Sequence, residues 1–127
     1  MSSNNKRVLV VDDEQDITTV MKFGLRKFGF EVDVFNDPKI ALSQFKPNYY
    51  SAIILDVRIP GMTGFELARR IWAMDPNARI CFFSAFEVYE NEARKTFVDF
   101  KTHCFIKKPI VPSQLAKHIE EHLLTVN

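Results

Sequence analysis

A chain of 127 residues has the length of one ordinary domain and is long enough to bury a substantial apolar core. Hydrophobic residues make up 46% of it and charged residues 26%, which excludes a disordered chain, and no run approaches the ~20 apolar residues of a membrane span. The formal net charge of +1 gives no long-range field that would favour a nucleic-acid backbone or an anionic membrane. We therefore expect one domain over residues 1–127 that binds neither nucleic acid nor membrane.

The two cysteines, Cys81 and Cys104, lie in apolar runs and lack the paired spacing of a zinc site or of a secreted disulfide framework. We expect both to be buried free thiols, because free cysteine is usually a core residue. The N-terminal segment 1–6 is polar and contains no signal-peptide stretch. These features predict a cytoplasmic protein.

The first part of the chain predicts two strands separated by a helix. Residues 7–11 form a β-branched run typical of a strand, and residues 14–28 carry apolar side chains at helical spacing. Gly29 follows where the end of a helix favours a residue free to adopt positive φ. Residues 31–35 then alternate between apolar and acidic side chains, which is typical of an edge strand.

The middle of the chain predicts a helix, a buried strand and a second helix. An Asp-Pro pair at 37–38 supplies an N-cap followed by proline at the first helical position, and Pro47 ends that helix. Residues 51–55 are apolar except at the first position, so both faces of this strand should be covered. A helical apolar stripe over 65–72 follows a loop and stops before Pro76.

The last part predicts a strand at 78–83, a helix around 93–100, a strand at 104–106 and a final helix over 112–123. The order is therefore a strand followed by a helix, five times over. Parallel strands need crossover connections, so this alternation predicts an α/β fold with a parallel sheet and helices on both of its faces. The crossovers should be right-handed.

Polar residues collect where the predicted strands end: Asp12, Asp13, Asp56, Ser84 and Lys108. A single Asp at a strand end is usually a turn or capping residue, but five such groups after four separate strands are not explained by turn chemistry. In an open α/β sheet the carboxyl ends of the strands form the ligand crevice, so these side chains should converge. Oxygen ligands without His or Cys favour Mg²⁺. We therefore predict a Mg²⁺ site in which Asp56 attacks phosphorus while Lys108 and Ser84 stabilise the phosphoryl oxygens.

The segments that contain these residues resemble the receiver domain of two-component response regulators. They are Val8–Glu14, Ile54–Gly64, Ser84–Ala85 and Phe105–Pro109. The resemblance covers about residues 6–124, which leaves 1–5 and 125–127 as flexible ends. It implies a flavodoxin-like, doubly wound (βα)5 three-layer sandwich with parallel strand order 2-1-3-4-5. It also implies a signalling domain of the single-domain, chemotaxis-regulator-like type rather than an enzyme, with chemistry limited to its own phosphorylation and dephosphorylation.

Position by position, the resemblance makes Asp56 the phospho-acceptor. Asp13 and Asp56 would ligate Mg²⁺ directly, with Mn²⁺ as a substitute. Asp12 would act largely through water, and the backbone carbonyl of Arg58 would be a further ligand. Arg58 and Phe86 would also stand beside the approach of water to phosphorus, where neither side chain can act as a base, so the phosphoryl group should be lost slowly.

The resemblance also assigns a conformational switch. Lys108 matches the lysine that precedes Pro109, and the bond between them is often cis in relatives, which the sequence permits. Ser84 and Phe105 match the switch pair, a hydroxyl that moves toward the phosphoryl group and an aromatic ring that turns inward behind it. The implied partners are a sensor histidine kinase or phosphotransfer protein and a downstream protein. The latter would bind the face made by the fourth helix, fifth strand and fifth helix.

Two features depart from this pattern or compete with it. Segment 99–103 contains no glycine, whereas the family often has a small, glycine-containing turn before the fifth strand. The alternative function is a haloacid-dehalogenase-like Mg²⁺ phosphatase with an Asp nucleophile, but Arg58 stands where such enzymes carry a second Asp. A flavin-binding module lacks a recognisable phosphate-cradling loop. His118 and His122 are four residues apart, but no third ligand is evident, so we expect surface or rim positions for both.

Overall fold

The computed structural model describes residues 6–86, 91–92, 94–95 and 104–121. One parallel sheet has the strand order β2-β1-β3-β4-β5. Its strands are β1 (Arg7–Val11), β2 (Glu31–Phe35), β3 (Ala52–Asp56), β4 (Ile80–Ser84) and β5 (Cys104–Lys107). The predicted flavodoxin-like fold and its strand order are confirmed.

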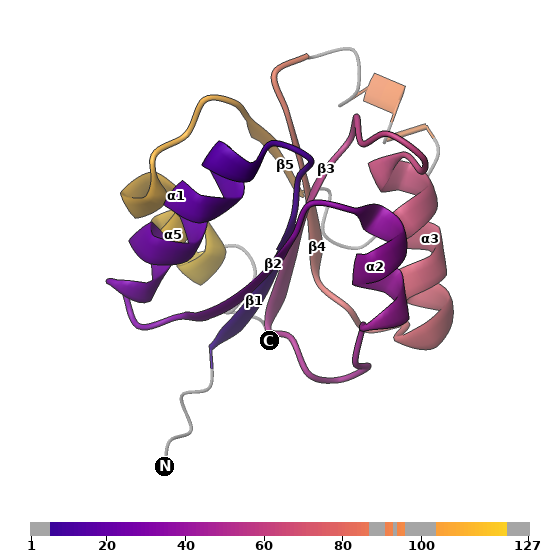
Figure 1. The fold of residues 1–127 in the computed structure, drawn as a ribbon, viewed down its shortest axis with the longest axis horizontal. Helices are drawn as coiled ribbons and strands as arrows, with labels where there is room; N and C mark the ends of the chain where they lie inside the picture. The colour runs from indigo at the N-terminus through magenta and orange to yellow at the C-terminus, as the bar shows by residue number, and fades with distance from the viewer. Residues whose placement is uncertain (1–5, 87–90, 93, 96–103, 122–127) are drawn as a thin grey trace.

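Helices cover both faces of the sheet, giving three layers (Figure 1). On one side lie α1 (Gln15–Arg26) and α5 (Pro112–Ile119), and on the other lie α2 (Pro38–Ser43) and α3 (Gly64–Met74). The predicted fourth helix around 93–100, the glycine-free segment 99–103 and the ends at 1–5 and 125–127 fall wholly or mostly outside the described residues. In the described part of the chain, no helix is both long and apolar enough to cross a membrane.

Local signals explain where several elements begin and end. The Asp37 carboxylate accepts hydrogen bonds from the backbone N–H groups of Lys39 and Ile40, which caps α2 ahead of Pro38 as predicted. Thr63 caps α3 in the same manner, because its Oγ1 accepts from the N–H of Glu66 at 3.1 Å. Gly29 has a φ of +91°, the left-handed conformation that glycine adopts without strain after a helix.

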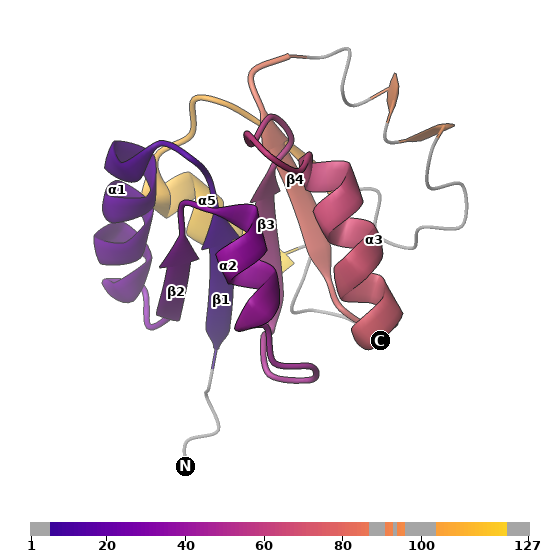
Figure 2. The same cartoon turned by 45° about the vertical axis from the view of Figure 1, so that its right-hand side comes forward.

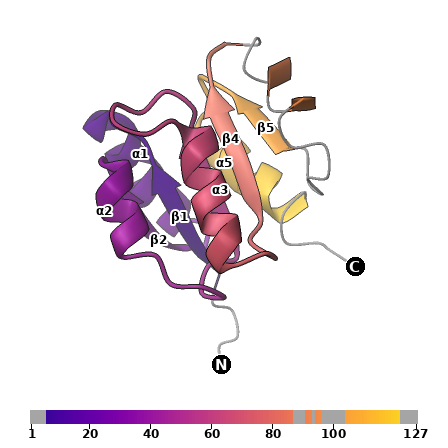
Figure 3. The ribbon, with the colours of Figure 1, turned by 90° about the vertical axis from the view of Figure 1, so that its right-hand side faces the viewer.

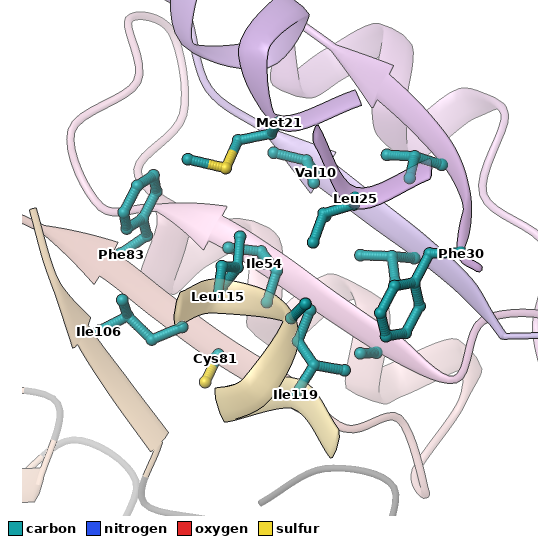
Figure 4. Close-up of a cluster of buried hydrophobic side chains, with 14 of the residues drawn as sticks. Val10, Met21, Leu25, Phe30, Ile54, Cys81, Phe83, Ile106, Leu115 and Ile119 are labelled. Atoms are coloured by element: carbon teal, nitrogen blue, oxygen red, sulfur yellow. The ribbon is translucent and has the colours of Figure 1, made fainter. Parts of the chain in front are cut away.

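The core consists of two apolar layers, one on each side of the sheet. The layer under α1 and α5 contains buried side chains such as Val10, Leu25 and Ile119 (Figure 4). The layer under α2 and α3 includes Leu55 and Phe82. Since β3 and β4 are buried along their whole length, their apolar side chains pack into one layer or the other. This packing holds the carboxyl ends of the central strands in fixed positions.

The two cysteines are buried, as expected, but they are not free. The register of β4 and β5 sets Cys81 directly beside Cys104, with their Cα atoms 4.7 Å apart, and the structure joins them in a disulfide. This Cα separation lies within the span that a disulfide bridges. The prediction of free thiols was therefore wrong, because it considered spacing along the chain whereas the contact arises between neighbouring strands.

All five strands run in the same direction, so their carboxyl ends meet at one edge of the sheet (Figures 2 and 3). The polar residues singled out by the sequence lie at this edge: Asp12 and Asp13 follow β1, Asp56 and Ser84 are the last residues of β3 and β4, and Lys108 follows β5. The parallel strands therefore bring these residues to the same edge of the sheet.

Candidate functional site

Three carboxylates meet at the carboxyl edge of the sheet. Asp12 follows β1 and Asp56 ends the neighbouring strand β3, and one oxygen from each, together with one from Asp13, lie within 4.8 Å of one another. Asp12 and Asp56 are buried, at 0% and 5% exposure, whereas Asp13 is exposed. The structure thus brings together the three acidic residues that the sequence predicted as a cluster.

Lys108 supplies a cation to this cluster from the loop after β5. Its Nζ lies 2.9 Å from Asp12 Oδ2 and 3.5 Å from Asp56 Oδ1. Its backbone N–H donates to the carbonyl of Ser84 at 2.9 Å, which ties this loop to the end of β4. The peptide bond between Lys108 and Pro109 is cis, the isomer that the sequence permitted without requiring.

Two residues that the sequence reasoning missed hold the loop after β1. The Nδ2 of Asn36 donates to the backbone carbonyl of Asp12 at 2.7 Å and to Thr18 Oγ1 at 3.0 Å. The backbone N–H of Glu14 donates to Asp12 Oδ1 at 2.9 Å. Asp12 is therefore fixed by hydrogen bonds to both its main chain and its side chain. The signal that could have indicated Asn36 is its position directly after β2, at the same edge of the sheet.

Gly64 sets the shape of the loop that follows Asp56. Its N–H donates to the carbonyl of Val57 at 2.9 Å, and a Cβ at this position would overlap the backbone carbonyl of Asp56. Only glycine allows so close an approach of the two backbones. The first residue of α3 therefore packs directly against the backbone of Asp56.

The remaining predicted residues line a pocket above Asp56. Ser84 is buried, and its Oγ accepts from the N–H of Phe86 at 3.1 Å. The guanidinium carbon of Arg58 lies 5.5 Å from the centre of the Phe86 ring, within the range of a cation–π contact. The pocket is lined by Asp13, Asp56, Arg58, Ser84, Phe86 and Lys108, among others.

Phe105 lies outside this pocket lining. It is half-buried on β5 beside Phe82 and packs against the apolar layer under α3. Its neighbour on β4, Phe82, lies two residues before Ser84, which is the residue of that strand that lines the pocket. Its ring is therefore in contact with the core and not with the pocket.

The charges in the site are unbalanced. Burial, and then the charge of Asp12, raise the pKa of Asp56 to about 6, against the lowering effect of Lys108. Burial lowers the pKa of Lys108, but its hydrogen bond to Asp12 and the nearby carboxylates raise it by more, so it remains a cation. Three carboxylates against one close ammonium leave a site whose oxygen ligands and negative charge fit a hard divalent cation.

The chain matches the family model of the response regulator receiver domain over residues 8–120. The chain belongs to this family. The receiver domain family is a signalling family rather than a classical enzyme family, and nothing found supports the haloacid-dehalogenase alternative. The predicted function as a response regulator receiver is thereby confirmed.

Two relatives indicate how this receiver domain compares with longer proteins. The transcriptional regulatory protein PrrA of Mycobacterium bovis is 32% identical over 114 residues, which are 90% of this chain and 48% of PrrA. The regulatory protein VanRB of Enterococcus faecalis is 32% identical over 114 residues, which are 90% of this chain and 50% of VanRB. The receiver domain thus spans about half the length of these curated relatives.

Solved structures agree with the family. The chemotaxis protein CheY4 of Vibrio cholerae aligns with a TM-score of 0.77 at 27% identity, covering 94% of this chain and 99% of CheY4. The response regulator TrrA of Thermotoga maritima, solved in complex with Mg²⁺-BeF, aligns with a TM-score of 0.77 at 28% identity, covering 93% of this chain and 99% of TrrA.

Proposed function

We propose that this receiver domain accepts a phosphoryl group on Asp56 and signals through altered association with a partner protein. The observation that carries the proposal is a buried carboxylate, Asp56, that lines a pocket with the Nζ of Lys108 at 3.5 Å and two further carboxylates beside it. In the proposed step an Asp56 oxygen forms a bond to phosphorus. The bond from phosphorus to the donor's leaving atom breaks, and its electron pair stays with that atom.

Mg²⁺ fits the donor set, and Mn²⁺ accepts the same oxygen ligands. We propose that the carboxylates of Asp13 and Asp56 and the backbone carbonyl of Arg58 hold the ion, with Asp12 acting largely through water. Bound Mg²⁺ would offset the charge of the carboxylates and of the phosphoryl oxygens. Asp13 is the exposed member of the acidic cluster and lines the pocket, so it can reach an ion that enters from solvent.

Lys108 and Ser84 are proposed to stabilise the transferred group. Lys108 is held by Asp12 at 2.9 Å, and a small movement of its ammonium would bring it from Asp12 to a phosphoryl oxygen. Ser84 Oγ accepts a hydrogen bond from Phe86 and can still donate its own hydroxyl hydrogen to the phosphoryl group. Positive charge and a hydroxyl donor would then contact the group once it is on Asp56.

We further propose a sensor histidine kinase or phosphotransfer protein as the phosphoryl donor. The downstream protein would bind the face built by the predicted fourth helix, β5 and α5, and the domain would act in the cytoplasm without direct contact to nucleic acid or membrane. Its chemistry would be limited to self-directed phosphotransfer and autodephosphorylation. Family membership supports the proposed donor and a downstream protein partner, because receiver domains interact with histidine kinases and downstream effectors.

The proposed function can be tested with the purified chain, Mg²⁺ and a small acyl phosphate. Intact-mass measurement should detect one added phosphoryl group per chain, lost on brief treatment with alkali as expected of an acyl phosphate. A metal chelator should reduce the phosphorylated fraction by at least roughly 100-fold, since the uncompensated carboxylates repel the phosphodonor. Equal phosphorylation with and without chelator would contradict the assignment of a metal-assisted site.

The switch is expected to transmit phosphorylation from Ser84 to Phe105. Amide and side-chain NMR signals of Phe105 and of α5 should shift on phosphorylation, because a new local charge that attracts Ser84 favours a different packing of the adjacent ring. In Ser84→Ala these distant shifts should largely disappear while phosphorylation persists. Ser43→Ala, which alters an exposed hydroxyl on α2, serves as the matched control. Shifts confined to a few residues around Asp56 in the wild type would refute this switch.

We propose that Arg58 and Phe86, which touch each other and both line the pocket, crowd the approach of water without offering a base, so the phosphorylated state is expected to be long-lived. Arg58→Asn and Phe86→Ala should each shorten the lifetime measured after removal of the phosphodonor, and the double variant should shorten it by roughly an order of magnitude. Arg69→Asn, on the exposed face of α3, is the matched control. Unchanged or longer lifetimes in all three variants would disprove shielding.

A further inference from the structure

A second cluster of ligand-forming side chains lies on the opposite side of the sheet from α2 and α3. It consists of Cys81 on β4, Cys104 on β5 and His118 on α5, and their two sulfur atoms and one ring nitrogen lie within 4.8 Å of one another. The Nε2 of His118 is 3.1 Å from the Sγ of Cys104. Cys81 belongs to the apolar layer next to α5 (Figure 4).

The structure places His118 at a half-buried rim position, as expected, but corrects the interpretation that no further ligands lie near it. The sequence offered no third ligand because Cys81 and Cys104 are far from His118 along the chain, and only the packing of α5 on the sheet brings them together. His118 is half-buried and belongs to the last turn of α5. His122 lies outside the described residues.

We propose that the reduced form of this cluster, named here the Cys81–Cys104–His118 site, binds Zn²⁺. Two thiolates and one imidazole match the ligand preference of this ion, and three protein ligands with water in the fourth position are a known arrangement of zinc sites. Ligand atoms bound about 2.0–2.3 Å from zinc lie roughly 3.3–3.8 Å apart, which is close to the separation of Cys104 Sγ and His118 Nε2.

Burial excludes thiolates without a cation, so the reduced pair is either two neutral thiols or a metal complex. Cys81 is 0% exposed and Cys104 is 6% exposed, so two anionic sulfur atoms at this place require a compensating cation. Their binding to Zn²⁺ forms two Zn–S bonds and releases the two thiol protons to solvent. The half-buried imidazole of His118 completes the set at the edge that solvent can reach.

The disulfide and the zinc complex exclude each other, because the same two sulfur atoms form both. Conversion of the disulfide to the zinc-binding form takes up two electrons and two protons from a dithiol or phosphine reductant and breaks the S–S bond. In either state the pair links β4 to β5, and only the zinc complex also links these strands to α5 through His118.

The experiment uses the whole chain, reduced with a phosphine that is then removed without oxygen. Saturating Mg²⁺ is present to compete at the acidic cluster. One equivalent of Co²⁺ should give thiolate-to-metal charge-transfer bands, and one equivalent of Zn²⁺ should abolish them. Zinc affinity follows from competition with a chromophoric chelator.

We expect Cys81→Ala to lose the bands and His118→Gln to weaken zinc binding by at least roughly 100-fold. Lys117→Gln, an exposed neighbour on α5, should bind as the wild type does.

Each variant is compared with the wild type by its melting temperature with and without Zn²⁺, so that a failure to fold is recognised. Zinc should raise the melting temperature of the reduced wild type and of Lys117→Gln, but not that of the oxidised wild type. The proposal is overturned if the folded, reduced wild type gives no thiolate bands. Equal zinc affinity in a folded His118→Gln, or in the disulfide form, would also overturn it.

Discussion

Asp56→Asn is expected to abolish phosphorylation by small phosphodonors, with a loss of at least roughly 100-fold in the phosphorylated fraction. The amide that replaces the carboxylate has no anionic oxygen to attack phosphorus. Asp12 cannot take over this role efficiently, since it is fully buried and bound to Lys108. Intact-mass measurement after incubation with Mg²⁺ and an acyl phosphate gives the result directly.

The matched control for this experiment is Asp16→Asn, which removes an exposed carboxylate from the first turn of α1. It should be phosphorylated to the wild-type level. Phosphorylation of Asp56→Asn to the same extent as the control would show that another residue accepts the group, and peptide mapping would then identify it.

The same substitution is expected to stabilise the metal-free protein at neutral pH. Because the pKa of Asp56 is about 6 in the folded protein, against 3.8 for an ordinary aspartate, the folded protein retains this proton to higher pH than the unfolded chain does. Wild-type stability should therefore fall as pH rises from about 4 to above 6, relative to a variant without this carboxyl group. A difference of about 2.2 pH units corresponds to about 3 kcal/mol, as an order of magnitude.

Urea unfolding in the presence of a chelator measures this effect at pH 4.5, 5.5 and 7.5. The gain in the free energy of unfolding for Asp56→Asn should be small at the lowest pH and approach its full value at the highest. Asp16→Asn, whose carboxylate is exposed, should show no comparable change with pH. A stability gap that stays constant across this range would mean that Asp56 titrates normally in the fold.

The alternation of strands and helices was determined by the sequence itself, because its signals are local. The Asp37 cap is made by its own carboxylate and the next few N–H groups, and Gly29 takes positive φ one turn after its helix. Neither depends on distant residues. The burial of β3 was equally predictable from the sequence, because a strand with apolar side chains on both faces must be packed against other elements on both faces.

The convergence of Asp12, Asp56 and Lys108 was also predictable, although these residues are far apart in sequence. Parallel strands end at the same edge of a sheet, so residues that follow different strands meet there whatever the detailed packing. The strand order, however, came from the resemblance to receiver domains and not from periodicity, because alternation alone does not say which strands are neighbours.

Only the tertiary structure decided which side chains touch across the elements. The disulfide between Cys81 and Cys104 depends on the register of β4 against β5, which a shift by one residue would destroy. The contact of His118 with Cys104 depends on how α5 packs on the sheet, and the need for glycine at position 64 arises from the approach of its backbone to that of Asp56. These contacts join residues that no local pattern relates, so their physical cause is the packing of the whole domain.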